Sequence, residues 1–534
     1  MTKKVERGIS RRSFIKGTVA GAGIIATTGR GLIGSGPDDL YAATQQGKYS
    51  FEIPPPAIPT SDIKQTKTAD VVVVGLGMAG VPATLSAAEA GVRVVALEKQ
   101  ESVNTMGAQD IGMIGTKWHK AQGMTWTPEI TNEAIRELMK WGANRIDQRL
   151  LRIWVNRGPE DWDWLTAMTD PAGINWQPRI WPPPEPWDNS RENYRQYPTA
   201  ATLSRSEFAR MLNILADKAK SLGAALHFGT TAKQLIKTQN RVTGVIARNK
   251  DGDYIQFNTN KGIILCTGDY GYNTEMLEKY VPHVAFRKHS LKPTSMGEGH
   301  QMAMWIGAQM EPTPHAPMCH AMDFGLLGNT AFLHVNKFGE RFQNEDVSGQ
   351  AWNDQVEEQP GMFAWQIIDS NWKERLPHMS IGHGSMVSAG DGSMSMLNNA
   401  ITANTIGELA TKMSVPVETL KVTVERYNKM AYAGIDTDFA KPSHRLFPID
   451  KPPFYAGKAG AAVMLVVMGG LLCNTDLQAY DADFNVIRGL YLAGNTVGRR
   501  FAVSYPTTCP GVSNGLALTH GRYAGLKAAA DDGK

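Results

Sequence analysis

The chain has 534 residues, of which 42% are hydrophobic and 20% charged, enough for a large core and more than one compact domain usually holds. Its formal net charge of +4 comes from residues 1–43, whose seven Lys or Arg and three Asp or Glu leave the rest of the chain neutral. A neutral body without basic runs argues against nucleic acid as a partner.

The N-terminus has the features of an export signal. The run Ser10-Arg11-Arg12-Ser13-Phe14-Ile15-Lys16 precedes a weakly apolar stretch, Gly17–Gly29, that is too short to span a bilayer as a helix. Its paired arginines match a twin-arginine signal. We therefore expect residues 1–43 to be a signal peptide and the protein to act in the periplasm or at the outer face of the cytoplasmic membrane. The polar, proline-rich residues 44–67 are expected to form a linker.

Residues 70–98 contain a complete dinucleotide-binding pattern. The β-branched run Val71–Val74 predicts a strand buried on both faces of a parallel sheet. A Gly-x-Gly-x-x-Gly turn follows, formed by Gly75, Gly77 and Gly80. It opens a helix of small residues whose N-terminus suits phosphate groups. A second strand, Val92–Leu97, ends at Glu98, whose carboxylate can accept both hydroxyls of a ribose. The spacing fits a dinucleotide and does not distinguish NAD from FAD.

The rest of the chain alternates between two kinds of pattern. An amphipathic helix is predicted at Phe208–Ala219, and short strands at 225–228, 232–236, 242–247 and 254–257. A second buried strand leads into Gly268, and the same strand-to-glycine pattern returns at 489–495, before a closing helix at 511–525. Between 301 and 450 helices and loops replace this pattern. We therefore expect an α/β fold whose nucleotide-binding domain is discontinuous, formed by residues 68–300 and 451–534, with an inserted α+β capping domain at 301–450.

Several further motifs occur in order between residues 68 and 530. They are Cys266-Thr267-Gly268, Gly297-Glu298-Gly299, Val335–Glu345, Pro453–Ala456, Met468-Gly469-Gly470 and Gly489–Asn495. Together with the pattern at 70–98, they resemble the fumarate reductase and succinate dehydrogenase flavoprotein superfamily, in particular its soluble flavocytochrome c-like and 3-ketosteroid dehydrogenase branches. The resemblance implies a Rossmann-like FAD-binding domain, with FAD bound across both ends of the chain and substrate between the flavin and the cap.

The resemblance also implies which residues bind FAD. They are Gly75, Gly77, Ala79, Gly80, Glu98, Lys99, Asn104, Thr105, Gln109, Gly268, Gly494, Asn495, Gly511 and Val512. In membrane-bound relatives a histidine at the position of Asn104 holds the flavin covalently, so FAD is expected to be non-covalent here. The four cysteines form no Cys-x-x-Cys motif, and no haem, zinc or other metal site is predicted. A cytochrome or a membrane quinol system in trans is therefore the expected electron donor.

Three charged positions of the fumarate reductases are missing from this chain. The arginine that donates a proton falls on Gly349, the histidine before Met-Gly-Gly on Val466, and the arginine that binds the substrate carboxylate on Thr508. A dianion needs paired cations to offset its desolvation, so fumarate is a poor candidate substrate. Arg499 and Arg500 are close in sequence, but we expect one of them to bind backbone or phosphate.

A tyrosine stands near these missing groups. Tyr505 matches the ketosteroid dehydrogenase tyrosine that holds the substrate carbonyl, although two extra residues separate it from Gly511, which matches the glycine of that pair. A phenol can donate a hydrogen bond to a carbonyl or a proton to carbon. A tyrosine that only closes the flavin pocket is the alternative. In the cap, His320 is nearest by count to the family's substrate-binding histidine.

These observations predict an exported FAD-dependent oxidoreductase that reduces an activated C=C bond of a small enone or acrylate with electrons from a partner. One alternative is the reverse chemistry, a Δ1-type dehydrogenation of a 3-ketosteroid, which Tyr505 also serves. An alternative from another class is a flavin electron-transfer subunit without its own substrate.

Overall fold

The computed structural model describes residues 49–533 apart from 104–108, 179–194, 286–291, 321–324, 380–396, 398 and 461–462. The predicted signal peptide and the start of the predicted linker lie outside these residues. So do two predicted flavin-binding residues, Asn104 and Thr105. None of the helices within the described ranges combines the length and the hydropathy needed to cross a bilayer.

A large sheet forms the base of the fold, and eight strands of the described chain take part in it. Its parallel strands are β1 (Ile63–Val74), β2 (Val94–Leu97), β6 (Ala225–His227), β9 (Tyr254–Leu265) and β17 (Val486–Leu492). Three antiparallel strands complete it, namely β7 (Thr231–Thr238), β8 (Arg241–Arg248) and β16 (Gln478–Tyr480). The strand at 71–74 is fully buried, as its β-branched run predicts.

The sheet differs from the sequence prediction in two places. The strands predicted at 254–257 and before Gly268 form one continuous strand, β9. Residues 254–258, the first part of β9, pair with both β1 and β8, and these pairings extend the strand. Residues 63–67, expected in the linker, belong to β1 and pair with β9. Phe51, which also lies within the predicted linker, is buried against Tyr280.

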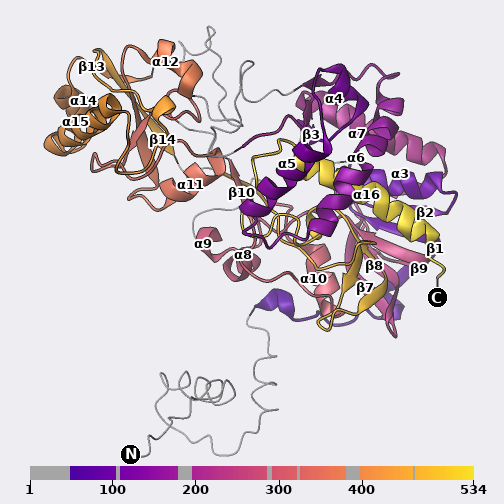
Figure 1. Cartoon of the computed structure of the whole chain (residues 1–534). Helices are drawn as coiled ribbons and strands as arrows, with labels where there is room; N and C mark the ends of the chain where they lie inside the picture. The colour runs from indigo at the N-terminus through magenta and orange to yellow at the C-terminus, as the bar shows by residue number, and fades with distance from the viewer. Residues whose placement is uncertain are drawn as a thin grey trace, which may run out of the picture. The chain divides into compact units, whose positions relative to one another are not determined.

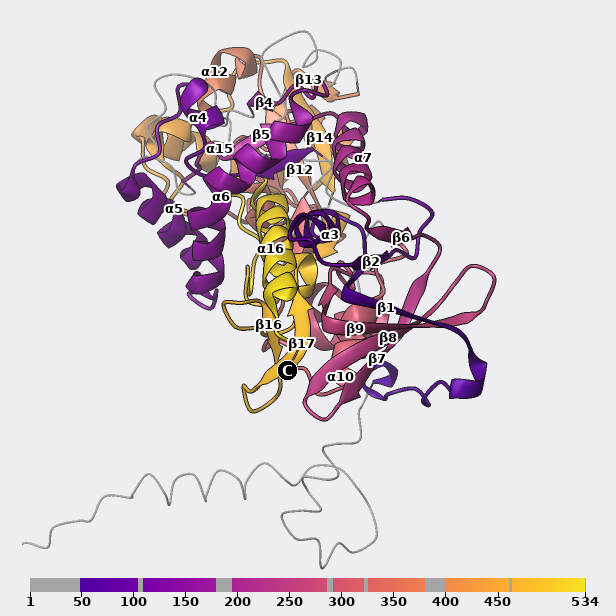
Figure 2. The same cartoon turned by 90° about the vertical axis from the view of Figure 1, so that its right-hand side faces the viewer.

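Two helices of mostly small residues at their contact pack closely beside this sheet. α3 (Gly80–Glu89) lies against α16 (Val512–Ala530), far apart in sequence but side by side in Figure 2. A Cβ at Gly521 would overlap the carbonyl oxygen of Ala79, and one at Gly525 would overlap that of Ala83. Because neither glycine has a side chain, the two helix backbones can approach this closely. α6 (Gln148–Thr169) and α7 (Arg205–Ser221) pack against α16 and α3, respectively.

A second sheet has its own hydrophobic core. Its antiparallel strands are β11 (Leu333–Val335), β12 (Phe363–Ile368), β14 (Phe454–Gly460) and β13 (Ile401–Ala403). Helices α14 (Ile406–Met413) and α15 (Val417–Ala433) cover it, in orange in Figure 1. The division into domains stays a prediction, but β14 lies beyond the expected boundary at 450 and pairs with β12 and β13 rather than with the large sheet.

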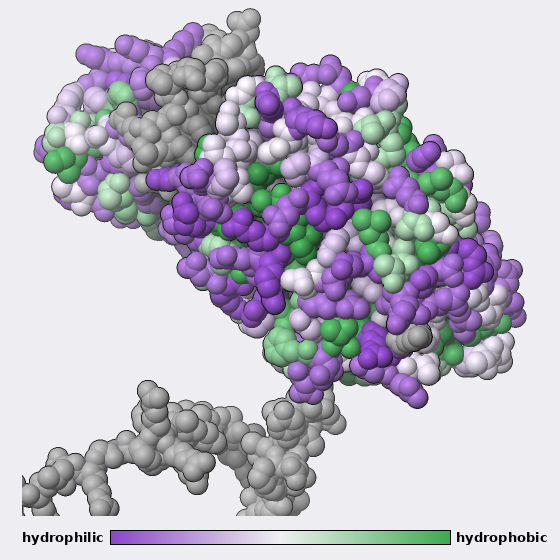
Figure 3. All heavy atoms as spheres, turned by 45° about the vertical axis from the view of Figure 1, so that its right-hand side comes forward, coloured by the Kyte–Doolittle hydropathy of each residue, from purple (hydrophilic) through white to green (hydrophobic). Residues whose placement is uncertain are grey.

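The remaining elements connect these parts. The helices are α4 (Lys117–Ala121), α5 (Pro128–Trp141), α8 (Thr274–Tyr280), α9 (Pro282–Ala285), α10 (Glu298–Trp305), α11 (Gly349–Glu357) and α12 (Trp372–Met379). The strands are β3 (Asp110–Gly112), β4 (Gln177–Pro178), β5 (Ala200–Thr202), β10 (Pro317–His320) and β15 (Val463–Val467). On the face drawn in Figure 3, hydrophilic residues cover most of the surface and hydrophobic ones show in smaller areas.

Candidate functional site

The carboxyl ends of four parallel strands meet at one edge of the large sheet. In register, Val74 at the end of β1 is paired with Leu97 of β2 and with Leu265 of β9, and Leu265 is paired with Leu492 of β17. The segments that follow these strands are the glycine turn at 75–80, Glu98, the turn at 266–268 and residues 493–495. Ligands of open α/β sheets bind beside such an edge. The structure therefore brings together segments that are separated by up to four hundred residues in sequence.

The glycine turn forms a tight cradle. Gly75 has φ +96°, and a Cβ there would overlap the carbonyl oxygen of Cys266. A Cβ at Gly80 would overlap the carbonyl oxygen of Gly75, so α3 can begin directly at the turn only with glycine. At Gly268, by contrast, no atom lies within 4 Å of where a Cβ would be. The tight packing at Gly75 and Gly80 and the open space at Gly268, after β9, fit a bound dinucleotide.

Glu98 is fixed at the end of β2. Its Oε2 accepts a 2.8 Å hydrogen bond from the N–H of Leu76, and its Oε1 accepts a 2.9 Å bond from the N–H of Gln100. The side chain is buried. Because a carboxylate has about four acceptor positions, two remain for a ribose diol. This geometry fits the role predicted for Glu98.

Lys99 and Gln109 are two other predicted flavin-binding residues. Lys99 forms a 2.7 Å ion pair with Glu298 and also donates to the carbonyl of Thr294. Gln109 is exposed, and its backbone carbonyl accepts from the N–H of Leu203. The Lys99 side chain is therefore already paired within the protein, whereas Glu98 has acceptor positions left. Gly77 and Ala79 lie within the turn that leads into α3.

The C-terminal segments of the predicted site pack against the N-terminal ones. Gly494 has φ +67°, and a Cβ there would lie 2.9 Å from the Cβ of Ala79. Gly511 has φ +74°, and its Cβ would lie 2.6 Å from the backbone nitrogen of Gly112. Gly511 immediately precedes Val512, the first residue of α16. Both ends of the chain thus contribute to the same region, and its residues fit FAD.

The structure places Tyr505 and Gly511 at the same helix end. Tyr505 is buried, its ring packs edge-on against Phe501 with centroids 5.1 Å apart, and its hydroxyl accepts from the backbone N–H of Ser513 in the first turn of α16. Burial raises the pKa of Tyr505 above its usual value. The phenol therefore keeps its proton at neutral pH and can act as a donor.

The third predicted catalytic residue, His320, lies elsewhere in the chain's architecture. It ends β10, where its backbone is paired with Val463 of β15. Its side chain lies outside the part of the structure that is described. A role for His320 stays a prediction.

The three positions without the expected charges are all buried. Gly349 begins α11, and Val466 lies in β15 opposite Met318. The Thr508 hydroxyl donates to the carbonyl of Arg195. None of these side chains is a cation.

A buried cation lies nearby instead. Arg500 is fully buried; its Nε donates to the carbonyl of Val497 at 3.1 Å and its Nη2 to Oδ1 of Asn495 at 2.6 Å. This agrees with the prediction that one of the two adjacent arginines binds backbone. Burial lowers the pKa of Arg500 to about 10, so the guanidinium stays charged at neutral pH.

Glu311 is a second charged group that the sequence did not predict. Its Oε1 accepts a 3.0 Å bond from the N–H of Gly470 and its Oε2 a 2.8 Å bond from the N–H of Arg499. Burial raises the pKa of Glu311 to about 7. No local pattern surrounds this residue in sequence. Only the fold brings it to the segment that contains Arg500.

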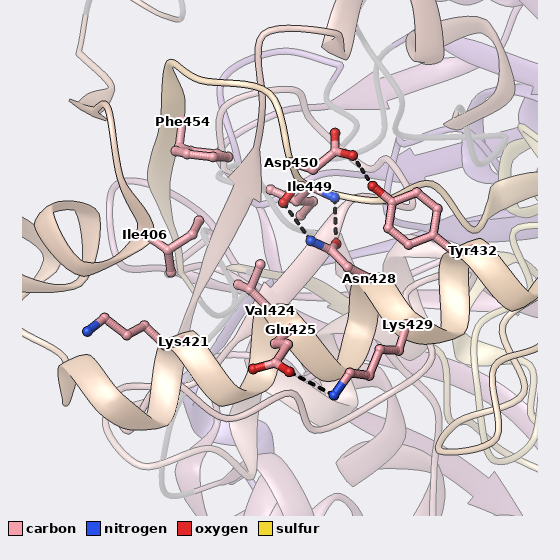
Figure 4. A pocket seen from close by; sticks show the side chains of 10 residues that line it. All are labelled: Ile406, Lys421, Val424, Glu425, Asn428, Lys429, Tyr432, Ile449, Asp450 and Phe454. Carbon is pink, nitrogen blue, oxygen red and sulfur yellow. Dashed lines mark hydrogen bonds and ion pairs between the residues drawn. The ribbon is translucent and has the colours of Figure 1, made fainter.

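A cavity of about 430 Å³ lies along α15, away from these residues (Figure 4). Asn428 and Ile449 exchange two hydrogen bonds across it, and Tyr432 donates to Asp450. Glu425 pairs with Lys429 on the same helix. None of the residues that line it is a predicted site residue, so we do not assign substrate to this cavity.

Comparison with known proteins connects this geometry to a family. Residues 70–516 match the family model described as FAD binding domain. The probable fumarate reductase Ifc3 of Shewanella frigidimarina is 27% identical over 84% of this chain and 76% of its own. The vinyl phenol reductase of Lactiplantibacillus plantarum is 27% identical over 86% of this chain and 96% of its own.

A solved structure has the same fold. The 3-ketosteroid-Δ4-(5α)-dehydrogenase of Rhodococcus jostii RHA1 superposes with a TM-score of 0.71, covering 90% of this chain and all of its own, at 23% identity. The expected α/β fold with a parallel sheet is thereby confirmed.

Proposed function

Because the chain belongs to the FAD binding domain family, it is an oxidoreductase with FAD as cofactor, and we propose that it reduces an activated C=C bond of a small enone or acrylate. Relatives named for the reduction of fumarate and of a vinyl phenol support this reaction type, since both compounds have a polarised C=C bond. We further propose that FAD is held non-covalently, because Asn104 cannot form the bond that a histidine forms.

The absence of cations at three positions indicates which kind of electron-accepting substrate suits this chain. Gly349, Val466 and Thr508 offer no charge to a second carboxylate. Removing a dianion from water without paired cations costs several kcal/mol per charge, roughly. An acceptor with one carbonyl or one carboxylate therefore suits this chain better than fumarate.

The observation that supports the proposal most is the protonated, buried Tyr505 beside the first turn of α16. When bound and reduced, FAD supplies the hydride. Tyr505 donates its proton to the α-carbon or holds the carbonyl oxygen by a hydrogen bond. The N-terminus of α16, at Gly511 and Val512, stabilises negative charge that develops there. The burial of Tyr505 keeps bulk water from competing for its proton.

We also propose that electrons reach the flavin from a partner. The sequence has no haem or iron–sulfur motif, so we propose a cytochrome or a membrane quinol system as donor. The twin-arginine pattern at Arg11 and Arg12 supports export to the periplasm or the outer face of the cytoplasmic membrane.

The experiment is an anaerobic reoxidation assay. The purified flavoprotein is reduced with dithionite, and flavin absorbance is followed after separate addition of an enone, a cinnamate, urocanate and fumarate. We expect reoxidation by an enone or acrylate, slowed by about 100-fold or more in Tyr505→Phe. Tyr254→Phe, at the opposite end of β9, is the matched control. Equal reoxidation by fumarate would contradict the substrate class.

The same residue also suits the reverse reaction, dehydrogenation of a 3-ketosteroid, because Tyr505 can polarise its carbonyl. A saturated ketosteroid that reduces the oxidised flavin, together with no reoxidation by any enone, would favour that alternative. A flavin that reacts with neither would favour an electron-transfer subunit without its own substrate.

A further inference from the structure

Arg500 is an unusual residue for a protein interior, because one edge of its guanidinium lacks a partner. Nε and Nη2 are bonded to Val497 and Asn495, but Nη1 has no hydrogen-bond partner among the described residues. No surface of Arg500 is exposed to water. A buried, incompletely paired cation costs several kcal/mol, roughly, and its retention calls for a compensating role.

The contacts of Arg500 connect it to the flavin-binding segments. Asn495, which accepts from Nη2, is one of the residues implied to bind FAD. Nη2 also lies 3.9 Å from the sulfur of Met468, and that sulfur lies 3.8 Å from the hydroxyl of Ser513 in the first turn of α16. The guanidinium stacks near Phe501, 5.2 Å from the ring centroid. The charge therefore lies within the shell of residues that surrounds the cofactor site.

Glu311 is attached to the same backbone segment. It accepts from the N–H of Arg499, the residue next to Arg500, and from the N–H of Gly470. Its own backbone N–H donates to the carbonyl of Gly470 at 2.9 Å. Two hydrogen bonds to the carboxyl group and one from the Glu311 backbone thus fix Glu311 relative to the segment that contains Arg500. The two side chains attract each other electrostatically in a medium of low dielectric.

The buried histidines, tyrosines and cysteine around this pair are neutral at pH 7. Burial lowers the pKa of His300 and His315 to about 4 and that of His520 to about 3. Burial raises the pKa of Cys473 to about 12 and raises those of Tyr270 and Tyr505 above their usual values. The half-buried Arg499 is the other cation next to Glu311. Arg500 and Glu311 therefore differ from these neutral groups, because both can carry a charge near neutral pH.

We propose that Arg500 and Glu311 form a buried charge pair that sets the reduction potential of the bound flavin. Reduction adds negative charge to a flavin, and a nearby cation favours the reduced form, whereas a carboxylate opposes it. Since burial brings the pKa of Glu311 to about 7, the net charge of the pair falls from +1 towards zero as the pH rises through neutrality. The flavin is then harder to reduce at higher pH than proton uptake by the flavin alone explains. The inference rests on FAD as cofactor and does not depend on the substrate proposed above.

The test is a spectroelectrochemical titration of the FAD-loaded protein without substrate, at about pH 6 and about pH 8. In Arg500→Met we expect the ratio of reduced to oxidised flavin at a fixed potential to fall about tenfold, which is about 30 mV for a two-electron couple. Arg500→Lys keeps the charge and should restore most of this ratio. Arg488→Gln, which removes an exposed arginine of β17, is the control.

Glu311→Gln gives an independent result of opposite sign. It should raise the ratio of reduced to oxidised flavin at about pH 8 and leave it unchanged at about pH 6, where Glu311 is protonated in the parent protein. An Arg500→Met protein that binds FAD stoichiometrically with the parent potential would overturn the proposal. If that variant fails to bind FAD, an unchanged potential of Glu311→Gln at both pH values would overturn it.

Discussion

Gly521 of α16 lies directly against the backbone carbonyl of Ala79, the residue that precedes α3, with no room for even a methyl group. This contact holds the last helix of the chain against the helix whose N-terminus is predicted to face the FAD phosphates. The close approach of the two helices depends on the absence of a side chain at Gly521 rather than on an attractive group. Adding a methyl group at this position therefore tests it.

Gly521→Ala should push α16 away from α3. Overpacking of this kind costs about 1–3 kcal/mol of unfolding free energy, and we also expect weaker FAD binding because residues at the start of both helices are predicted to bind FAD. Thermal unfolding and FAD content of the purified protein measure the two effects. Gly407→Ala, in the first turn of α14 beside the flexible end of Lys421, is the control and should be neutral or slightly stabilising. Equal midpoints for the two variants would disprove this account.

Glu98→Gln should weaken FAD binding while the protein stays folded. The amide replaces one carboxylate oxygen by a donor that faces a backbone N–H, and hydrogen bonds to a charged group are worth about 1.5–3 kcal/mol each. We expect Kd for FAD to rise about 10- to 100-fold, measured by flavin fluorescence quenching on the apoprotein. Glu101→Gln, an exposed neighbour, should leave Kd unchanged. An unaltered Kd for Glu98→Gln would remove Glu98 from the ribose site.

Stability should decrease as the pH falls from about 6.5 to about 4.5. Burial lowers the pKa of the buried histidines to about 4 or about 3; they are His119, His300, His315, His334 and His520. In this range the unfolded chain binds protons that these histidines do not bind in the folded protein, so acid favours unfolding. Glu311 has the opposite effect on stability, because the folded protein binds its proton more tightly than the unfolded chain does. It accounts for one proton, whereas the histidines account for five.

Urea unfolding at several pH values measures this effect. Each such histidine contributes about 1.4 kcal/mol per pH unit in this range. His334→Gln should flatten the dependence without removing it. A midpoint that does not change with pH over this range would contradict the assignment of neutral buried histidines.

Arg341→Met should destabilise the four-stranded sheet region. Arg341 is buried and bridges Glu345 at 2.8 Å and Asp436 at 2.7 Å, and Lys441 lies 3.3 Å from Glu345. Loss of one partner from a buried ion pair typically costs about 3–5 kcal/mol, because a carboxylate is left without full compensation. Arg426→Met, which removes an exposed ion pair with Asp438, should change the unfolding free energy by less than about 1 kcal/mol. Similar losses in both variants would contradict this explanation.

The parts of the fold that follow from local pattern could be predicted from sequence. The β-branched run at 71–74, the glycine turn and Glu98 each report on neighbours within about thirty residues, and the structure has β1, α3 and β2 in that order. The continuous strand β9 was missed because its first half is stabilised by pairing with β1 and β8, which its own sequence does not reveal.

The sequence predicts those site residues that belong to a motif. It does not predict charged residues that only the fold brings close together. Tyr505 and Gly511 are close in sequence, and both lie at the start of α16. Glu311 reaches the segment of Arg500 from nearly two hundred residues away, and no spacing rule connects them. In the sequence Arg500 is only one of two adjacent arginines, because its burial and its missing hydrogen-bond partner are properties of the folded chain.

The close contact between α3 and α16 also has a consequence for biosynthesis. During translation, α3 leaves the ribosome more than four hundred residues before the helix that covers it. Until the last segment of the chain emerges, the small-residue face of α3 has no permanent neighbour and is available to chaperones or to aggregation. The predicted cofactor site includes residues at the start of both helices, so it should form only after α16 has been synthesised, and a chain that stops before α16 should neither retain FAD nor resist proteolysis.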